Sequence, residues 1–219
     1  MWGRLSSIRS ALVTGGASGI GAAVVHLLEQ EGVDVRSLDI ATGFDVSDPA
    51  AWDAVGGVDF AFLNAGIGGL GDDLAGYRLM LGANVDGVVF GVRRMEQAMP
   101  AGGSIVATAS LAGLVPMPAD PIYTLTKHAV VGYVRAIAPR LAERQIRINV
   151  ICPGFVDTPI VTAELREWIA AEGIPLIEPD QVAEVVLLAA RSDETGQAWV
   201  VQPGREPVQY EFHGVPGPR

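Results

Sequence analysis

The chain has 219 residues, of which 49% are hydrophobic and 18% are charged, so it can bury a sizeable core and is not intrinsically disordered. Its formal net charge of −10 argues against binding to nucleic acid or to an anionic membrane surface. A single cysteine excludes an intrachain disulfide, the three histidines form no spaced metal cluster, and no apolar run reaches the ~18 residues of a membrane span. We therefore expect a soluble, cytoplasmic protein without a bound metal.

In the first half of the chain, short apolar runs alternate with longer helical patterns, which predicts βαβ units and a parallel sheet. A helix from about residue 19 to residue 31 is expected to end at Gly32 in the left-handed conformation. A long helix should cover roughly residues 74–98, despite Gly82, Gly87 and Gly91. The strands expected in this half are residues 11–14, 33–39, a short third at 44–46, and 58–63.

The second half continues the same alternation. Asp120 has the pattern of a helix N-cap, and Pro121 that of the first helical residue, where its missing N–H costs nothing. This helix should run to about residue 143, and residues 203–219, with four of the 14 prolines, should form an irregular tail. The other elements expected are strands at 104–108, 146–151 and 198–201, a helix core at 182–190, and a mixed, mobile segment at 159–173.

A glycine-rich turn between the first strand and the first helix is a candidate binding site. Glycines let backbone N–H groups approach a pyrophosphate closely, and a helix N-terminus adds positive potential. Glycine clusters also occur in purely structural turns, but the strand–turn–helix context favours a dinucleotide cofactor. The residues expected to contact it are Gly15, Ala17, Ser18, Gly19, Ile20 and Gly21.

Asp39, at the end of the second strand, indicates which dinucleotide is bound. A carboxylate there can accept hydrogen bonds from both adenosine ribose hydroxyls and would repel a 2′-phosphate. Ala17 and Ile40 offer no cation for such a phosphate, and Arg36 has the opposite strand parity. The alternative is a simple strand-end carboxylate. The pattern favours NAD over NADP.

Tyr123 and Lys127 are four residues apart on the helix that begins at Pro121, so they share a face. A free phenol, with a pKa near 10, is a poor base at neutral pH. We expect Lys127, the first helical turn and an oxidised nicotinamide to lower the pKa of Tyr123. A tyrosine–lysine pair at this spacing is also common on protein surfaces. Here it follows Ser110 by 13 residues and lies near a strand end that should open at the cofactor cleft.

Several motifs together resemble the short-chain dehydrogenase/reductase family, in the same order, over about residues 10–202. They are the glycine turn, Asn64-Ala65-Gly66, Asn84, Ser110, Tyr123 to Lys127, and Pro153-Gly154. The resemblance implies one α/β domain over residues 1–202, a Rossmann-type doubly wound parallel sheet with about seven strands and helices on both faces. It also implies a homodimer or homotetramer, and a substrate lid near residues 159–173.

The roles of individual residues follow from the same resemblance. Tyr123 would be the general acid/base, and Lys127 would lower its pKa and bind the nicotinamide ribose. Ser110 would stabilise charge on the substrate oxygen, and Asn84 would hold a water that links Lys127 to solvent. The remaining cofactor contacts implied are Asn64, Ala65, Gly66, Asp45, Val46, Pro153, Gly154, Val156 and Thr158.

One branch of the family, that of 15-hydroxyprostaglandin dehydrogenase, is resembled more specifically, at residues 110–114, 121–123, 127–128, 131–132 and 151–156. It would imply oxidation of a secondary alcohol on a lipophilic substrate. The chain departs from the branch at Asp120, where the branch has a substrate-contacting glutamine, and in its tail. Asp120 has two compatible interpretations, helix N-cap and substrate contact. The residues expected to contact substrate are Ser110, Leu111, Met117, Asp120, Phe155 and Trp168, although half of the apolar wall can equally be ordinary core.

These observations favour an NAD-dependent oxidoreductase that interconverts a secondary alcohol and a ketone. A non-catalytic dinucleotide-binding sensor on the same fold is the alternative, since a fold does not fix a function. An epimerase or dehydratase with bound NAD would need a larger C-terminal substrate domain. Cys152 has no histidine placed to activate it and is expected to be a small buried hydrophobe.

Overall fold

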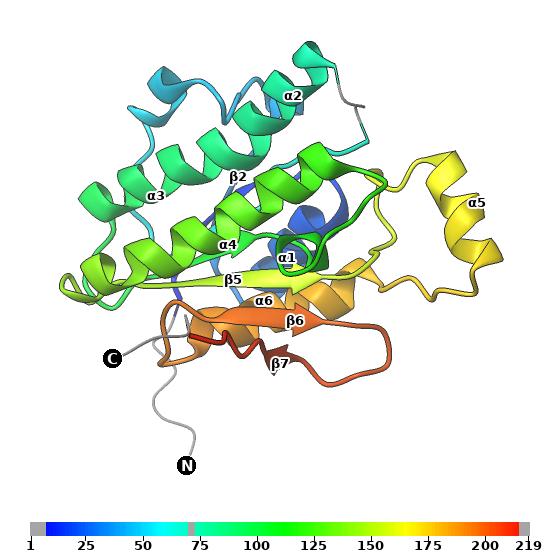
Figure 1. The fold of residues 1–219 in the computed structure, drawn as a ribbon. Helices are drawn as coiled ribbons and strands as arrows, with labels where there is room; N and C mark the ends of the chain where they lie inside the picture. The colour runs from blue at the N-terminus through cyan, green and yellow to red at the C-terminus, as the bar shows by residue number, and fades with distance from the viewer. Residues whose placement is uncertain (1–7, 70–72, 215–219) are drawn as a thin grey trace.

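The computed structural model describes residues 8–69 and 73–214, and its core is a sheet with helices on either side (Figure 1). Within these residues, the strand order is β2-β1-β3-β4-β5-β6-β7, and every neighbouring pair is parallel except β6 and β7. The strands are Ser10–Thr14 (β1), Asp34–Leu38 (β2), Phe60–Leu63 (β3), Ser104–Thr108 (β4), Arg147–Pro153 (β5), Ala198–Val201 (β6) and Val208–Gln209 (β7).

Alternation of side chains along the strands places a helix layer on each face. Leu12 and Ile105 pack in one apolar cluster with α3 and α4, whereas their neighbours Val13 and Val106 pack in a second cluster with α1 and α6. Figure 1 shows the two layers on opposite sides of the sheet, which confirms the predicted doubly wound architecture. The helices are Gly19–Gln30 (α1), Leu74–Leu81 (α2), Gly87–Ala98 (α3), Pro121–Ala142 (α4), Ala163–Ala171 (α5) and Pro179–Arg191 (α6).

The long helix predicted for residues 74–98 is confirmed, with one irregularity. A π-helical turn, Gly82–Asp86, joins α2 to α3 without a break. The glycine at position 91 of α3 has a packing role: a Cβ on Gly91 would lie 2.7 Å from Leu63 Cδ2 and 2.9 Å from Trp52 Cη2. The missing side chain lets the helix approach the sheet more closely than any larger residue would allow.

The short strand predicted at residues 44–46 is wrong. Two 3-10 turns, Ile40–Thr42 and Pro49–Trp52, surround this segment, and aspartate side chains cap both of them. The indole of Trp52 is buried, meets the ring of Phe44 edge-on at 5.2 Å, and donates through Nε1 to Val46 O at 3.0 Å. The segment therefore folds around one tryptophan instead of adding a strand beyond β2.

The seventh strand comes instead from the tail that was expected to be irregular. β7 pairs antiparallel with β6, and Tyr210 N continues the pairing with a hydrogen bond to Ala198 O (2.8 Å). Phe212 packs on the core beside α4, and the guanidinium of Arg135 lies 3.5 Å from its ring centroid. The tail thus covers the edge that β6 would otherwise expose.

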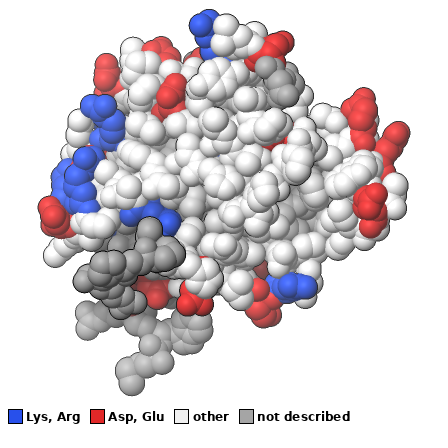
Figure 2. All heavy atoms as spheres, viewed as in Figure 1, with Lys and Arg blue, Asp and Glu red and all other residues white. Residues whose placement is uncertain are grey.

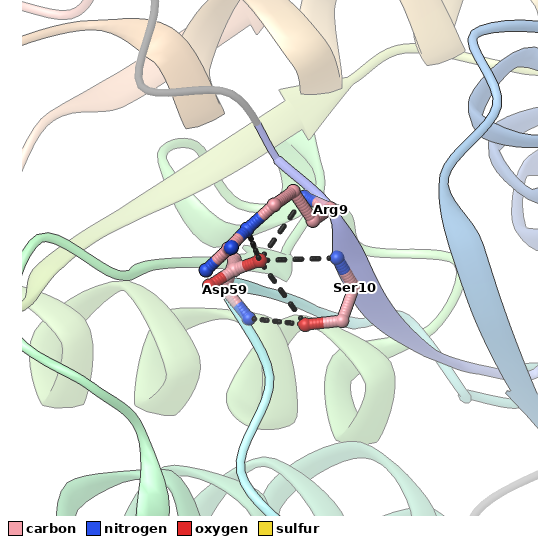
Figure 3. Close-up of polar contacts among 3 residues, drawn as sticks. All are labelled: Arg9, Ser10 and Asp59. Atoms are coloured by element: carbon pink, nitrogen blue, oxygen red, sulfur yellow. Dashed lines mark hydrogen bonds and ion pairs between the residues drawn. The ribbon is translucent and has the colours of Figure 1, made fainter.

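Asp59 joins the amino ends of β1 and β3, at the opposite end of the sheet from the predicted site. Its Oδ2 accepts from Arg9 N (3.0 Å), Ser10 N (3.1 Å) and Ser10 Oγ (3.1 Å), and Arg9 Nε lies 3.9 Å away (Figure 3). Burial alone would raise the pKa of Asp59, but the hydrogen bonds from Arg9 and Ser10 outweigh it and hold the pKa below its ordinary value.

We expect Asp59→Asn to lower the free energy of unfolding at neutral pH by about 2 kcal/mol, because hydrogen bonds to a charged group are lost. Because the pKa of Asp59 is lower in the folded state than in the unfolded state, its ionised form stabilises the protein above the ordinary carboxyl pKa. This stabilisation is lost as the pH falls from the ordinary carboxyl pKa through the lowered folded-state pKa. Urea unfolding from neutral pH to about pH 3 checks the expectation. The penalty should shrink on acidification, and Asp34→Asn, an exposed carboxylate on β2, should cause no comparable loss. An equal penalty at every pH would contradict this role of Asp59.

Candidate active site

The carboxyl ends of β1, β3 and β4 bring the polar residues predicted from sequence to one edge of the sheet. Asn64 directly follows β3, and Ser110 comes two residues after β4. Thr108 Oγ1 donates to Asn64 Oδ1 (3.1 Å), and Asn64 N donates to Thr14 Oγ1 (2.9 Å). Hydrogen bonds between side chains and backbone thus hold three strand ends in one polar frame, beside which α4 begins.

Tyr123 and Lys127 lie one turn apart near the start of α4, as predicted. Lys127 is buried, its Nζ lies 5.3 Å from the ring centroid of Tyr123, and it donates to Thr108 O at 3.1 Å. Ser110 Oγ accepts from Ala112 N (3.1 Å) and donates to Pro153 O (3.5 Å), and the Ser110 side chain lies close enough to the Tyr123 hydroxyl to lower its pKa. The structure therefore brings together Ser110, Tyr123 and Lys127 from two separate elements.

The pKa of Tyr123 shifts in the direction opposite to the one expected from sequence. Burial raises it to about 12, against the lowering effect of the Ser110 hydrogen bond, and the charge of Asp120 raises it further. Burial also lowers the pKa of Lys127 to about 8, which the nearby Cys152 partly opposes. Desolvation disfavours both charged forms, and the sequence pattern did not reveal how deeply the pair is buried.

Asn84 lies in the π-helical turn between α2 and α3 and is buried. Its Oδ1 accepts from Ile67 N (2.8 Å), and its Nδ2 donates to Ile67 O (2.9 Å) and Thr126 Oγ1 (3.0 Å). Thr126 Oγ1 in turn donates to Tyr123 O (2.8 Å). Asn84 therefore links the segment after β3 to the first turns of α4.

The glycine turn has the close backbone packing that a phosphate cradle requires. A Cβ on Gly21 would lie 2.0 Å from Gly15 O, so only glycine lets α1 start this close to the end of β1. Gly15 has φ +66° and Gly19 φ +52°, in the left-handed region. The first turn of α1 has no side-chain cap, because Ser18 at the N-cap makes no capping hydrogen bond. Its N–H groups are therefore available to an anion, and the residues fit a dinucleotide pyrophosphate.

The segment after β5 packs against this turn. A Cβ on Gly19 would lie 2.8 Å from Thr158 Cγ2, so Thr158, one of the implied cofactor contacts, lies next to the glycine turn. Thr158 Oγ1 donates to Val156 O (3.4 Å), and Val156 forms a parallel bridge with Ile177. Gly154 N donates to Val201 O (3.0 Å). Hydrogen bonds thus fix the backbone of 153–158 beside the cradle.

Asp39 lies beside the glycine turn, as the sequence predicted, and bonds with it. Its Oδ2 accepts from Ala17 N (3.0 Å) and its Oδ1 from Ala41 N (2.9 Å). The Asp45 carboxylate accepts from Ser47 N and Ser47 Oγ within its own turn, and Val46 is buried beneath α3. These contacts hold the loop after β2 in place.

The predicted substrate-side residues surround the start of α4 and reach to α5. Phe155 and Trp168 meet edge-on at 6.1 Å, and Trp168 keeps 49% of its surface exposed. The segment 159–173, expected to be mixed, contains the regular helix α5, which Thr162 caps by accepting from Leu165 N (3.2 Å). Figure 2 shows a broad uncharged surface over the middle of this face, with acidic residues beyond it toward α5.

Some residues that build the site were not singled out from sequence. Thr108 hydrogen-bonds the side chain of Asn64, and Thr126 hydrogen-bonds that of Asn84. The backbone N–H and C=O of Ile67 both bond the Asn84 side chain, 17 residues away in sequence. A threonine at the end of a buried strand was the only available signal, and it is a weak one. Cys152 is buried within the core, as the sequence predicted.

Among residues 8–69 and 73–214, no group of three or more histidine, cysteine, aspartate or glutamate side chains is placed to hold a metal ion. No helix in the same part of the chain is both long and apolar enough to cross a membrane.

Comparisons with known proteins agree with this fold. A family model described as Enoyl-(Acyl carrier protein) reductase matches residues 44–205. The chain is 32% identical to cyclohexanol dehydrogenase of Acinetobacter sp. (strain SE19), over 87% of this chain and 92% of that protein. It is also 32% identical to mouse (Mus musculus) 15-hydroxyprostaglandin dehydrogenase [NAD(+)], over 72% and 71%. A short chain dehydrogenase from Burkholderia cenocepacia J2315, solved in complex with NADP, superposes with a TM-score of 0.78 at 25% identity, over 92% of this chain and 98% of that one.

Proposed function

Because this chain belongs to the short-chain dehydrogenase/reductase family, we propose that it is an NAD-dependent oxidoreductase that interconverts a secondary alcohol and a ketone on a small, hydrophobic substrate. The observation that carries the proposal is the convergence of Ser110, Tyr123 and Lys127 beside a glycine cradle at one edge of the sheet. Relatives named as alcohol dehydrogenases support the reaction class.

The proposed chemistry assigns one task to each group. Ser110 and Tyr123 hydrogen-bond to the substrate oxygen, since the Ser110 side chain lies close enough to the Tyr123 hydroxyl to lower its pKa. In the oxidation direction, Tyr123 accepts the hydroxyl proton as the carbon loses hydride; in the reduction direction, Tyr123 donates that proton back. The nicotinamide, when bound, supplies the hydride acceptor or donor. Lys127 favours the phenolate through its positive charge, 5.3 Å from the ring centroid.

A hydrophobic substrate is supported by the residues around the catalytic edge. Phe155 and Trp168 form an aromatic pair beside the segment that holds Thr158, and Ile160 and Val115 are 38% and 51% exposed. Apolar walls with a few convergent polar groups are typical of small-molecule sites. Acidic side chains on α5 disfavour an anionic substrate there.

The reaction class is tested by mixing the protein with NAD and a panel of secondary alcohols, including cyclic and aromatic ones, while absorbance of the reduced nicotinamide is followed. We expect turnover with at least one apolar alcohol. A protein that binds NAD tightly but turns over none of the alcohols or matching ketones would be a dinucleotide-binding sensor on the same fold, and the proposal would fail.

We expect NAD to bind at least about tenfold more tightly than NADP, because the Asp39 carboxylate would repel a 2′-phosphate beside the glycine turn. Asp39→Ala should shrink this ratio, mainly by improving NADP binding. Calorimetric titration of both cofactors measures it. Asp34→Ala is the matched control, since Asp34 is an exposed carboxylate at the other end of β2. An unchanged ratio in Asp39→Ala would remove Asp39 from cofactor choice.

The family resemblance also leads us to propose a homo-oligomer. α3 and α4 carry a charged patch in which Arg93 and Arg140 are exposed and Glu96 is half-buried, beside the half-buried Tyr133. Arg140 Nη2 is paired with Glu96 Oε2 at 2.7 Å. Light scattering of the purified protein determines the subunit number directly.

A further inference from the structure

We propose that Asp120 is a positioning residue for the reaction: its carboxylate fastens the backbone at Gly68–Gly69 over the ring of Tyr123. Asp120 Oδ1 accepts from Tyr123 N (2.8 Å), which is the N-cap bond of α4. Asp120 Oδ2 accepts from Gly69 N (3.0 Å), 51 residues away in sequence. Helix capping requires only the first of these bonds, so the second oxygen has a separate role.

The backbone that Asp120 fastens lies directly against the catalytic pair. A Cβ on Gly68 would lie 3.2 Å from Tyr123 Cδ2 and 3.3 Å from Cε2, and a Cβ on Gly66 would lie 3.4 Å from Lys127 Nζ. Two glycines therefore let the main chain touch the phenol ring and approach the ammonium. A displacement of this backbone would leave space into which the Tyr123 ring can move, away from its position beside Ser110 and Lys127.

The same backbone is fastened at its other side by Asn84, which bonds both the N–H and the C=O of Ile67. Gly68 is thus bracketed by hydrogen bonds at Ile67 and at Gly69. Asn84 belongs to the π-helical turn, whereas Asp120 belongs to α4, so two different elements hold one short segment. We call Ile67, Gly68 and Gly69 the clamp segment.

The chemistry of the side chain at position 120 supports this role. Asparagine and serine cap helices as well as aspartate does, but only a carboxylate offers two acceptor atoms to two N–H groups. The charge has an electrostatic cost, because it raises the pKa of Tyr123 beside it. A neutral cap would avoid that cost, so the second acceptor is the feature that requires aspartate here.

The test compares Asp120→Asn and Asp120→Ser with Asp73→Asn. Asparagine and serine keep the cap on Tyr123 N; asparagine then presents a donor to Gly69 N, and serine does not reach it. Asp73 caps α2 by accepting from Gly76 N (2.7 Å), so its asparagine variant controls for helix capping. The measurements are kcat and KM with an active alcohol, the dissociation constant of NAD, and amide hydrogen exchange at residues 67–69.

We expect both Asp120 variants to keep NAD affinity, to exchange the Gly69 amide at least about tenfold faster, and to lose about tenfold in kcat. Loss of the negative charge by itself would favour the phenolate and raise the oxidation rate, so a fall in kcat separates positioning from electrostatics. Wild-type values of kcat and of Gly69 exchange in both variants would overturn the proposal. The kinetic expectation rests on the proposed oxidoreductase function, whereas the exchange measurement does not, so the two can fail separately.

Discussion

Tyr123→Phe should lower kcat for alcohol oxidation by about 10³-fold while leaving the affinity for NAD nearly unchanged. The variant removes only the hydroxyl, which lies beside Ser110 and is the proposed proton acceptor. The ring remains packed against Gly68 and beneath Lys127 Nζ, so the fold of the site should persist. Stopped-flow or steady-state absorbance of reduced nicotinamide measures the rate, and fluorescence titration measures NAD binding.

A matched control is available on the same helix. Tyr133 is half-buried on α4, where its surroundings include Arg93, Glu96 and Arg140 and no residue of the proposed site. Tyr133→Phe should therefore retain wild-type kcat. If Tyr123→Phe retains most of its rate, the assignment of proton transfer to this hydroxyl is wrong, whatever the control shows.

Gly21→Ala should weaken NAD binding by at least about 100-fold, the second large effect that we expect. The added methyl would lie 2.0 Å from Gly15 O and 2.9 Å from Asn64 Nδ2. Either α1 moves away from β1 or the glycine turn opens, and both changes disrupt the N–H groups proposed to hold the pyrophosphate. Calorimetry measures NAD affinity, and circular dichroism at rising urea measures the accompanying loss of stability.

Gly132→Ala serves as the control for the glycine substitution. Gly132 lies on α4, is exposed, and a Cβ there would meet nothing within 4 Å. Alanine in an exposed helix should be neutral or slightly stabilising. Folded Gly21→Ala protein with wild-type NAD affinity would show that the close approach of α1 to β1 is unrelated to cofactor binding.

The buried strands were predictable because each combines a short apolar run with a glycine, asparagine or proline boundary. β1, β3, β4, β5 and β6 all appear within two residues of their predicted positions. The Asp120–Pro121 start of α4 was likewise predictable, since capping depends on local sequence. The strand predicted at residues 44–46 failed because its apolar residues serve a local cluster around Trp52 instead of a ladder.

Features that depend on packing between distant segments were not predictable. β7 is only two residues long, and it exists because it pairs with β6. The local sequence of the tail carries no pattern that indicates this pairing. The direction of the Tyr123 pKa shift required knowledge of burial, which outweighs the favourable hydrogen bond from Ser110. The bond from Gly69 to Asp120 spans 51 residues, and nothing in the local pattern at either position indicates it.

The division of the apolar interior by the sheet has a consequence for how this molecule tolerates change. α1, which carries the glycine turn, rests on one half of the interior, and α4, which carries Tyr123, rests on the other. The glycine turn and Tyr123 are therefore supported by two different apolar clusters, one on each face of the sheet, and they come together at the carboxyl ends of the strands. Substitutions in the apolar cluster beneath α1 can change the affinity for the dinucleotide without moving Tyr123 and Lys127 on α4. Cofactor affinity and kcat can therefore vary independently of one another among relatives of this chain.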